Sequence, residues 1–169
     1  LAWIEFYRKD YDVAKAMFSA IVLDHPLAYL SHNGLAYIAI EQGEHEEAVG
    51  RLTTSISIAP YQPISVYLIP VVKLLDFDKF QGVDSILGLA ERAWPLSADI
   101  KFLRARAAQG LGNIEALERL VLGAAGLAPV PMSKILGAFK VSHEAQKELD
   151  IILAWGLYFG GYNEDAVMH

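Results

Sequence analysis

Glu41 and His45 are two residues whose types and spacing could bind a metal ion. On one continuous helix they would lie a turn apart and place a carboxylate and an imidazole on one face, which is half of a metal site. Gly43 lies between them and is expected to end the helix, and no second histidine is near in the sequence. The sequence therefore predicts a solvated acidic turn here, with no metal and no cofactor.

The sequence motifs that could indicate catalysis match this chain even less well than the metal-site pattern does. The segment Gly110–Gly112 resembles the start of a phosphate-binding loop, but Glu115 occupies the place of the third glycine and a helix is expected before it, not a strand. Ser-His-Asp catalysis lacks a Gly-x-Ser-x-Gly elbow. Asp76 and Asp78 flank a turn, with no apolar pocket evident that would raise a carboxyl pKa. We therefore expect that this protein is not an enzyme.

A repeat is the strongest pattern in the chain, and it must position any functional side chain. Four prolines are separated by 34, 35 and 34 residues: Pro26, Pro60, Pro95 and Pro129. Two apolar or small residues precede each proline at fixed offsets: Ala14 and Phe18, Ala48 and Leu52, Val83 and Leu87, Leu117 and Val121. A period near 34 residues with this pattern is typical of stacked pairs of helices.

The second unit is the clearest, and it resembles a tetratricopeptide repeat. Its first helix carries Leu35, Ala36 and Ala39, a turn follows at Gly43, and Ala48 lies on the second helix. The resemblance implies an all-α fold, a right-handed solenoid in which Ala48 packs against Leu35 and Ala36. We expect a single solenoid of units 1–26, 27–60, 61–95 and 96–129, an irregular insert 130–141 and a partial unit 142–169. Turns are expected near 9–10, 43–44, 77–79, 111–113 and 160–162.

Several segments depart from the pattern. Pro70 should kink or split the helix expected over residues 62–76. Residues 132–140 are expected to form a short inserted helix, and Ser142 to cap a long helix that ends at Phe159. Ser97 is a second expected cap. The chain begins at Leu1 without a methionine, and we expect it to be a fragment or the ordered part of a longer protein.

Composition narrows the partners. With 14 Lys+Arg against 20 Asp+Glu the net charge is −6, so nucleic acid is not an expected partner. Hydrophobic residues make up 54 % and the mean hydropathy is +0.29. No apolar run approaches the roughly 20 residues that span a bilayer, and a cytoplasmic location is favoured. The surplus apolar surface is expected to meet a partner protein or a second copy of the chain.

The resemblance also implies a concave groove lined by the first helix of each unit. The groove residues that it implies are Trp3, Phe6, Tyr7, Asn33, Tyr37, Phe102, Arg106, Gln109, Trp155 and Tyr158. For Trp3 and Trp155 a place in the groove and a place in the core are equally open, whereas Tyr37 and Arg106 favour the groove. In the third unit Leu68, Val72 and Leu75 are expected there, in a register that Pro70 disturbs.

Three functions are compatible with these features. The first is a protein-binding scaffold that holds a peptide or helix of another protein in its apolar, aromatic groove. The second is a type III-like secretion chaperone for hydrophobic exported proteins, which acidity and size favour. The third is a regulatory region cut from a larger enzyme or export assembly. One subfamily of tetratricopeptide proteins binds the C-terminal carboxylate of chaperone tails with a cluster of lysines and asparagines. Here only Asn33 occupies such a position, so we do not expect this protein to bind chaperone tails in that way.

Overall fold

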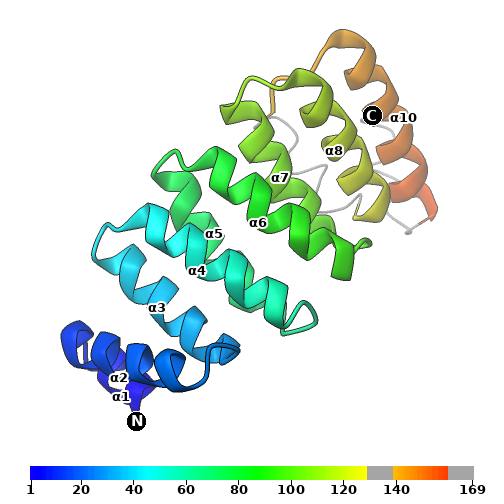
Figure 1. The fold of residues 1–169 in the computed structure, drawn as a ribbon. Coiled ribbons are helices and arrows are strands. Elements are labelled where there is room, and N and C mark those ends of the chain that lie inside the picture. The colour runs from blue at the N-terminus through cyan, green and yellow to red at the C-terminus, as the bar shows by residue number, and fades with distance from the viewer. Residues whose placement is uncertain (129–138, 160–169) are drawn as a thin grey trace. The chain divides into compact units, whose positions relative to one another are not determined.

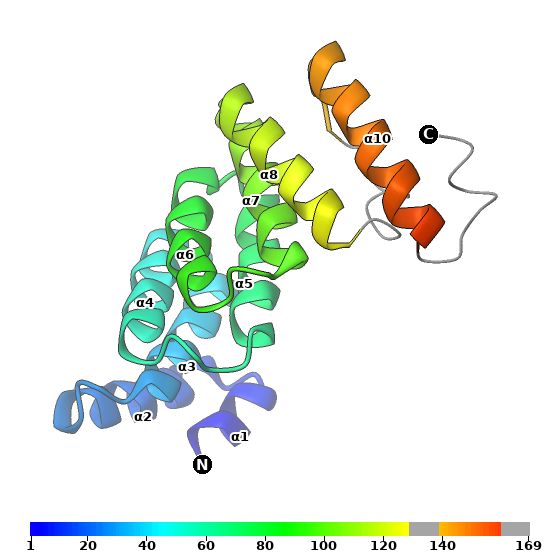
Figure 2. The ribbon, with the colours of Figure 1, turned by 90° about the vertical axis from the view of Figure 1, so that its right-hand side faces the viewer.

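A computed structural model describes residues 1–128 and 139–159, and all regular structure within these residues is helical (Figures 1 and 2). The chain divides into two compact units, Leu1–Trp94 and Pro95–His169. The first unit contains α1 (Ala2–Tyr7), α2 (Tyr11–Asp24), α3 (Tyr29–Glu41), α4 (His45–Ile58), α5 (Ser65–Asp76) and α6 (Phe80–Ala93). The second contains α7 (Ala98–Gly110), α8 (Ile114–Leu127) and α10 (His143–Phe159).

In the first unit the helices form the successive pairs α1–α2, α3–α4 and α5–α6. The first helices α1 and α5 both pack against α3, and the second helices α4 and α6 pack against each other. Ala14, Phe18 and Leu35 belong to one buried apolar cluster, on which Trp3 and Phe6 also pack. The core of this unit is therefore shared between neighbouring pairs, as expected for stacked repeats.

In the second unit α8 packs against both α7 and α10. Its core includes Leu117, Leu149 and Leu153, each without exposed surface. The N–H of Ser142 donates to Oε1 of Glu118 at 2.8 Å, which ties the start of α10 to α8. Of the inserted helix expected at 132–140, residues 132–138 lie outside the described residues, and so do the turn and helix expected after Phe159.

The turn inside each helix pair has the same geometry four times. One residue in each turn has a positive φ: Lys9 at 65°, Gly43 at 78°, Asp78 at 58° and Gly112 at 69°. The next residue donates its N–H to the carbonyl five positions earlier: Asp10 to Glu5, Glu44 to Ala39, Lys79 to Leu74 and Asn113 to Ala108. This arrangement is the Schellman motif, which satisfies carbonyls that the helix leaves unpaired. The turns predicted near 9–10, 43–44, 77–79 and 111–113 are thus confirmed.

The prolines act at the other end of each pair. Each follows the last capping residue of a second helix: His25, Ala59, Trp94 and Ala128. These four residues have φ between −128° and −144° and ψ between 61° and 80°. A following proline ring disfavours the helical region for the residue before it. The proline after each pair therefore ends the second helix of that pair, and the residue before the proline has the same backbone conformation each time.

Pro70 does not split its helix, so of the two predicted outcomes, a kink or a split, the split is wrong. Helix α5 is continuous from Ser65 to Asp76 with Pro70 inside it. A proline removes the hydrogen bond to the residue four positions earlier, here Val66, which lies in the first turn of α5. The helix also begins at Ser65 and not at residue 62, since Gln62 is buried in the preceding loop.

The two predicted serine caps are confirmed. The hydroxyl of Ser97 accepts a hydrogen bond from the N–H of Ile100 at 3.3 Å, and that of Ser142 accepts one from Ala145 at 3.3 Å. Each satisfies a donor that the first turn of a helix leaves unpaired. Helix α10 then extends to Phe159, as predicted.

Asp78→Gly should stabilise the protein by about 1 kcal/mol, because a left-handed backbone costs a residue with a Cβ about 1–2 kcal/mol and glycine almost nothing. The matched control Asp76→Gly lies at the end of α5 itself and should lower stability, by up to about 1 kcal/mol, because glycine is a poor helix residue. Urea unfolding of both variants measures the effect. If Asp78→Gly and Asp76→Gly lower the free energy of unfolding equally, the prediction is wrong.

Ala48→Leu should lower the free energy of unfolding by about 1–3 kcal/mol through overpacking. Ala48 has no exposed surface, and Leu35 and Ala36 on the facing helix α3 are buried as well. The adjacent control Glu47→Leu should cost far less, since the Glu47 side chain is 35 % exposed. Thermal melts compare the two variants. A melt in which Glu47→Leu collapses while Ala48→Leu stays like wild type would mean that the faces of α4 are reversed.

Candidate functional site

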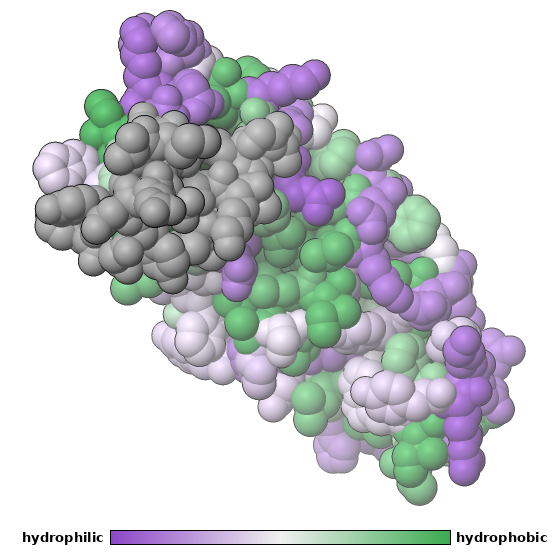
Figure 3. Space-filling view, turned by 180° about the vertical axis from the view of Figure 1, so that it is seen from behind, coloured by the Kyte–Doolittle hydropathy of each residue, from purple (hydrophilic) through white to green (hydrophobic). Residues whose placement is uncertain are grey.

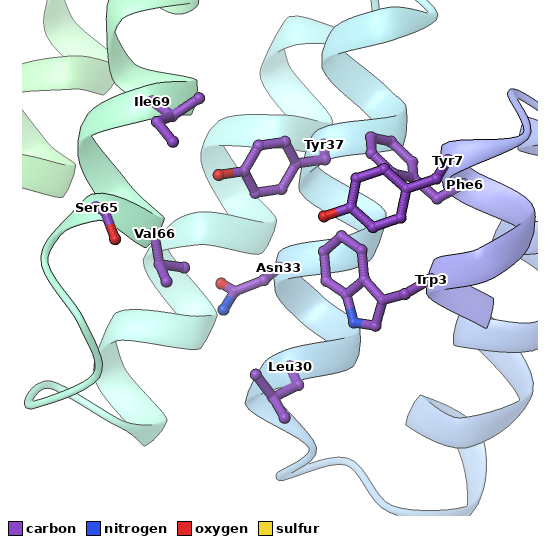
Figure 4. A pocket seen from close by; sticks show the side chains of 9 residues that line it. All are labelled: Trp3, Phe6, Tyr7, Leu30, Asn33, Tyr37, Ser65, Val66 and Ile69. Atoms are coloured by element: carbon purple, nitrogen blue, oxygen red, sulfur yellow. The ribbon is translucent and has the colours of Figure 1, made fainter. Parts of the chain in front are cut away.

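A pocket of about 380 Å³ opens between the first helices of the Leu1–Trp94 unit (Figure 4). Helices α1, α3 and α5 each contribute side chains to it. Nine residues line it: Trp3, Phe6, Tyr7, Leu30, Asn33, Tyr37, Ser65, Val66 and Ile69. This volume lies at the lower end of the range found for ligand pockets.

An aromatic cluster builds one wall of the pocket. The ring of Trp3 lies 5.1 Å from that of Phe18, 5.6 Å from Phe6 and 6.1 Å from Tyr37, and all three pairs meet nearly edge to face. Edge-to-face packing is a favourable arrangement for aromatic rings. Trp3 therefore has both roles that the sequence left open: it packs on the buried core and it lines the pocket.

The rim of the pocket is apolar and open to solvent. Tyr7 is 78 % exposed, Ile69 55 % and Leu30 54 %. Figure 3 views the molecule from behind, and its lower right part shows apolar and aromatic side chains of this unit gathered beside hydrophilic ones. Large apolar side chains that remain exposed around a hollow often mark a binding surface.

A buried polar network runs behind the pocket. Nδ2 of Asn33 donates to Oε1 of Gln62 at 2.7 Å, and Nε2 of Gln62 donates to the hydroxyl of Ser55 at 2.9 Å. The three side chains are 1 %, 5 % and 0 % exposed. The hydroxyl of Ser55 in turn donates to the carbonyl of Tyr29 at 3.3 Å. This network ties the loop before α5 to α3 and α4, and so positions one wall of the pocket.

Tyr37 brings a phenol to the pocket. Burial raises the pKa of Tyr37 above its usual value of 10.0, and the nearby Tyr7 adds a smaller effect in the same direction. The phenol is therefore neutral at physiological pH. Figure 4 shows the hydroxyls of Tyr37 and Tyr7 both directed toward the side of the pocket on which α5 lies.

The pocket brings together five of the side chains predicted for the groove: Trp3, Phe6, Tyr7, Asn33 and Tyr37. Sequence reasoning missed Leu30, which precedes Asn33 by nearly one helical turn and could have been found by extending the register of α3 backward. It also missed all three residues of α5.

On α5 the pocket is lined by Ser65, Val66 and Ile69, not by the predicted Leu68, Val72 and Leu75. Leu75 is buried, with 4 % exposed surface. The three predicted positions are equivalent, in the register of the repeat, to groove positions on α3. The pocket lies between α3 and α5, so α5 contributes the side that faces α3.

The remaining predicted residues belong to the second unit. Phe102 packs edge to face on Phe139 with ring centroids 5.3 Å apart, and Oε1 of Gln109 accepts the N–H of Lys140 at 3.1 Å. Both residues therefore hold the segment before α10. Arg106 is half-buried, and Trp155 is 59 % exposed. The side chain of Tyr158 lies outside those that the structure describes.

The candidate metal ligands have other partners. The carboxylate of Glu41 pairs with the ammonium of Lys73 from α5. The ring of His45 stacks on Phe77 at 4.2 Å. Among the described residues no group of three or more histidine, cysteine or acidic side chains could hold a metal ion. In the same part of the chain no helix is both long and apolar enough to cross a membrane.

The family model described as "Tetratricopeptide repeat" matches residues 1–63. No curated protein matches the sequence. Among solved structures, a crystal structure of MamA is similar with a TM-score of 0.61 and 14 % identity, covering 99 % of this chain and 89 % of that one. MamA 41-end from Desulfovibrio magneticus RS-1 gives 0.57 and 14 %, covering 99 % and 86 %. MamA MSR-1 C2 gives 0.54 and 18 %, covering 99 % and 87 %.

These similarities bear on fold and repeat type. The resemblance to tetratricopeptide repeats is confirmed by the family match over the first 63 residues. The predicted all-α solenoid fold is confirmed by the helical structure and by the MamA structures, which cover nearly the whole chain. At 14–18 % identity these structures show the fold alone.

Tyr37→Phe should change how stability depends on alkaline pH. The pKa of Tyr37 is raised in the folded state, so that state keeps a proton that the unfolded chain releases. This contribution is fully present below about pH 10 and is lost as the pH rises through the folded-state pKa. Wild type should therefore lose more stability than Tyr37→Phe between about pH 9 and 12. Urea unfolding at several pH values checks this, and a constant difference between the two proteins would contradict it.

Proposed function

We propose that this protein is an interaction scaffold that binds a peptide segment or helix of a partner protein in the pocket between α1, α3 and α5. The observation that carries the proposal is the exposure of large apolar side chains around an open hollow. Tyr7, Leu30 and Ile69 are each more than half exposed although they surround the pocket. Leaving such side chains in water costs free energy, which an apolar partner would recover.

The chemistry of the lining supports recognition of an apolar ligand. The nine lining residues, all within the described residues 1–128, include no carboxylate, no lysine or arginine and no histidine. Histidine and carboxylates are the side chains that most often serve in general acid–base catalysis. The lining contains three kinds of aromatic side chain instead, and aromatic residues often dominate the binding energy of protein interfaces.

Two kinds of occupant fit such a surface. An extended peptide could place one apolar anchor in the pocket, and an amphipathic helix could lay its apolar face along the first helices. Both would contact the exposed rim before the buried floor. The rim residues are therefore the ones whose replacement separates binding from folding.

Ile69→Glu and Leu30→Glu should each weaken peptide binding by about tenfold or more, because a carboxylate would enter an apolar contact. Both positions are exposed, so folding should be retained. The matched control is Leu23→Glu on α2, since Leu23 is 82 % exposed and does not line the pocket.

Peptides selected from a displayed random library against the full chain provide the probe, and calorimetry measures their affinity for each variant. Selected peptides should share an apolar anchor and should bind Leu23→Glu like wild type. If they bind the two pocket variants as tightly as wild type, they bind elsewhere and the proposal is wrong. Failure to select any peptide that binds would also overturn it.

A further inference from the structure

A second pocket, of about 350 Å³, adjoins the first along the same two helices. Five residues line it: Ile40, Glu41, Lys73, Asp76 and Phe77. On α3 it begins at Ile40, three positions after Tyr37 of the first pocket, and on α5 it begins at Lys73, four positions after Ile69. Spacings of three and four residues correspond to one helical turn. The two pockets therefore follow each other between α3 and α5, within the Leu1–Trp94 unit.

Two helices end at the second pocket. Glu41 is the last residue of α3, and Asp76 is the last residue of α5. The carbonyls at the C-terminal end of a helix carry a partial negative charge, which favours cations nearby. The two carboxylates add to this charge. Lys73 is the only basic residue of the lining, and its ammonium already pairs with Glu41.

Asp76 is the carboxylate that remains without a counter-charge. It is exposed, and within the described part of the chain it makes no hydrogen bond and no ion pair. A cation supplied by a partner would be attracted both by this carboxylate and by the helix end beside it. Residues 1–94 contain twelve Asp and Glu against seven Lys and Arg, and such an acidic unit attracts a basic partner from a distance.

The apolar part of the lining favours arginine over lysine as that cation. The ring of Phe77 stacks on His45 and is still 52 % exposed, whereas Ile40 is only 5 % exposed. A guanidinium group is planar, so it can stack on an aromatic ring and donate two parallel hydrogen bonds to one carboxylate. Its methylene stem can pack on apolar side chains. The ammonium of lysine is a compact and more strongly hydrated charge, which makes neither the stacked nor the two-fold contact.

We propose that the protein binds a partner segment that places an apolar anchor in the first pocket and an arginine in the second, with the guanidinium paired to Asp76. The second pocket is centred roughly two helical turns, or about 10 Å, beyond the first. An extended peptide covers this distance in about three residues and a helix in about seven. This inference rests on the proposed function and states the chemistry of the partner.

Replacement of arginine by citrulline in the library-selected peptides tests the proposal. The peptides that bind the first pocket should carry an arginine about three or about seven positions from their apolar anchor. Citrulline has nearly the shape of arginine but is neutral. Calorimetry with the full chain should show the citrulline peptide binding wild type about fivefold more weakly than the arginine peptide. In Asp76→Asn the two peptides should bind about equally.

Asp24→Asn is the matched control. Asp24 is the exposed last residue of α2 and lines neither pocket, so this variant removes the same charge from the same kind of position. It should keep the fivefold preference for arginine. If Asp24→Asn loses the preference as Asp76→Asn does, the preference arises from net charge and the inference is wrong. A lysine peptide that binds wild type as tightly as the arginine peptide would also overturn it.

Failure of this inference can be separated from failure of the proposed function. Selected peptides that bind wild type but not Ile69→Glu or Leu30→Glu establish binding at the first pocket. If those peptides carry no arginine, or bind equally well with citrulline, the inference is wrong and the proposed function stands. The proposed function itself fails only if no selected peptide depends on these two positions.

Discussion

The left-handed residue that closes each helix pair is the constraint on which the rest of the structure depends. It occurs at Lys9, Gly43, Asp78 and Gly112, and each time the same hydrogen bond links the residue after it to a carbonyl five positions earlier. Two helices joined this way are forced to run back along each other, so small residues such as Ala48 are needed where they cross. Because the geometry recurs, equivalent faces of successive first helices are aligned, and that alignment creates the pocket.

The buried network of Asn33, Gln62 and Ser55 is the second constraint, and it lies in a core that is mostly apolar. Polar groups in such a place stabilise only when they are hydrogen-bonded. Here they connect the loop before α5 to α3 and α4, which limits where α5 can lie. The width of the pocket between α3 and α5 therefore depends on hydrogen bonds, whose direction is more exacting than that of apolar contacts.

The fold could be predicted from the sequence because its signals are local. Prolines and glycines at fixed spacing restrict the backbone directly, whatever the rest of the chain does. Lys9 and Asp78 show the limit of this reasoning, since nothing in their residue types requires a positive φ, and the repeat alone indicates it. The pocket was predicted in part. The residues of α1 and α3 followed from the register, but those of α5 depend on how two helices pack, which periodicity within one helix does not determine.

Phe102 and Gln109 illustrate the same limit in the second unit. Both occupy positions equivalent to pocket residues of the first unit, yet they contact Phe139 and Lys140. A departure from the repeat has brought a segment of the chain against these side chains. Trp3 differs because it meets Phe18 and Tyr37 through ring edges, which holds it rigidly while leaving it at the pocket wall. A wall fixed in this way loses little conformational freedom on binding, and such preorganisation increases affinity without any additional contact.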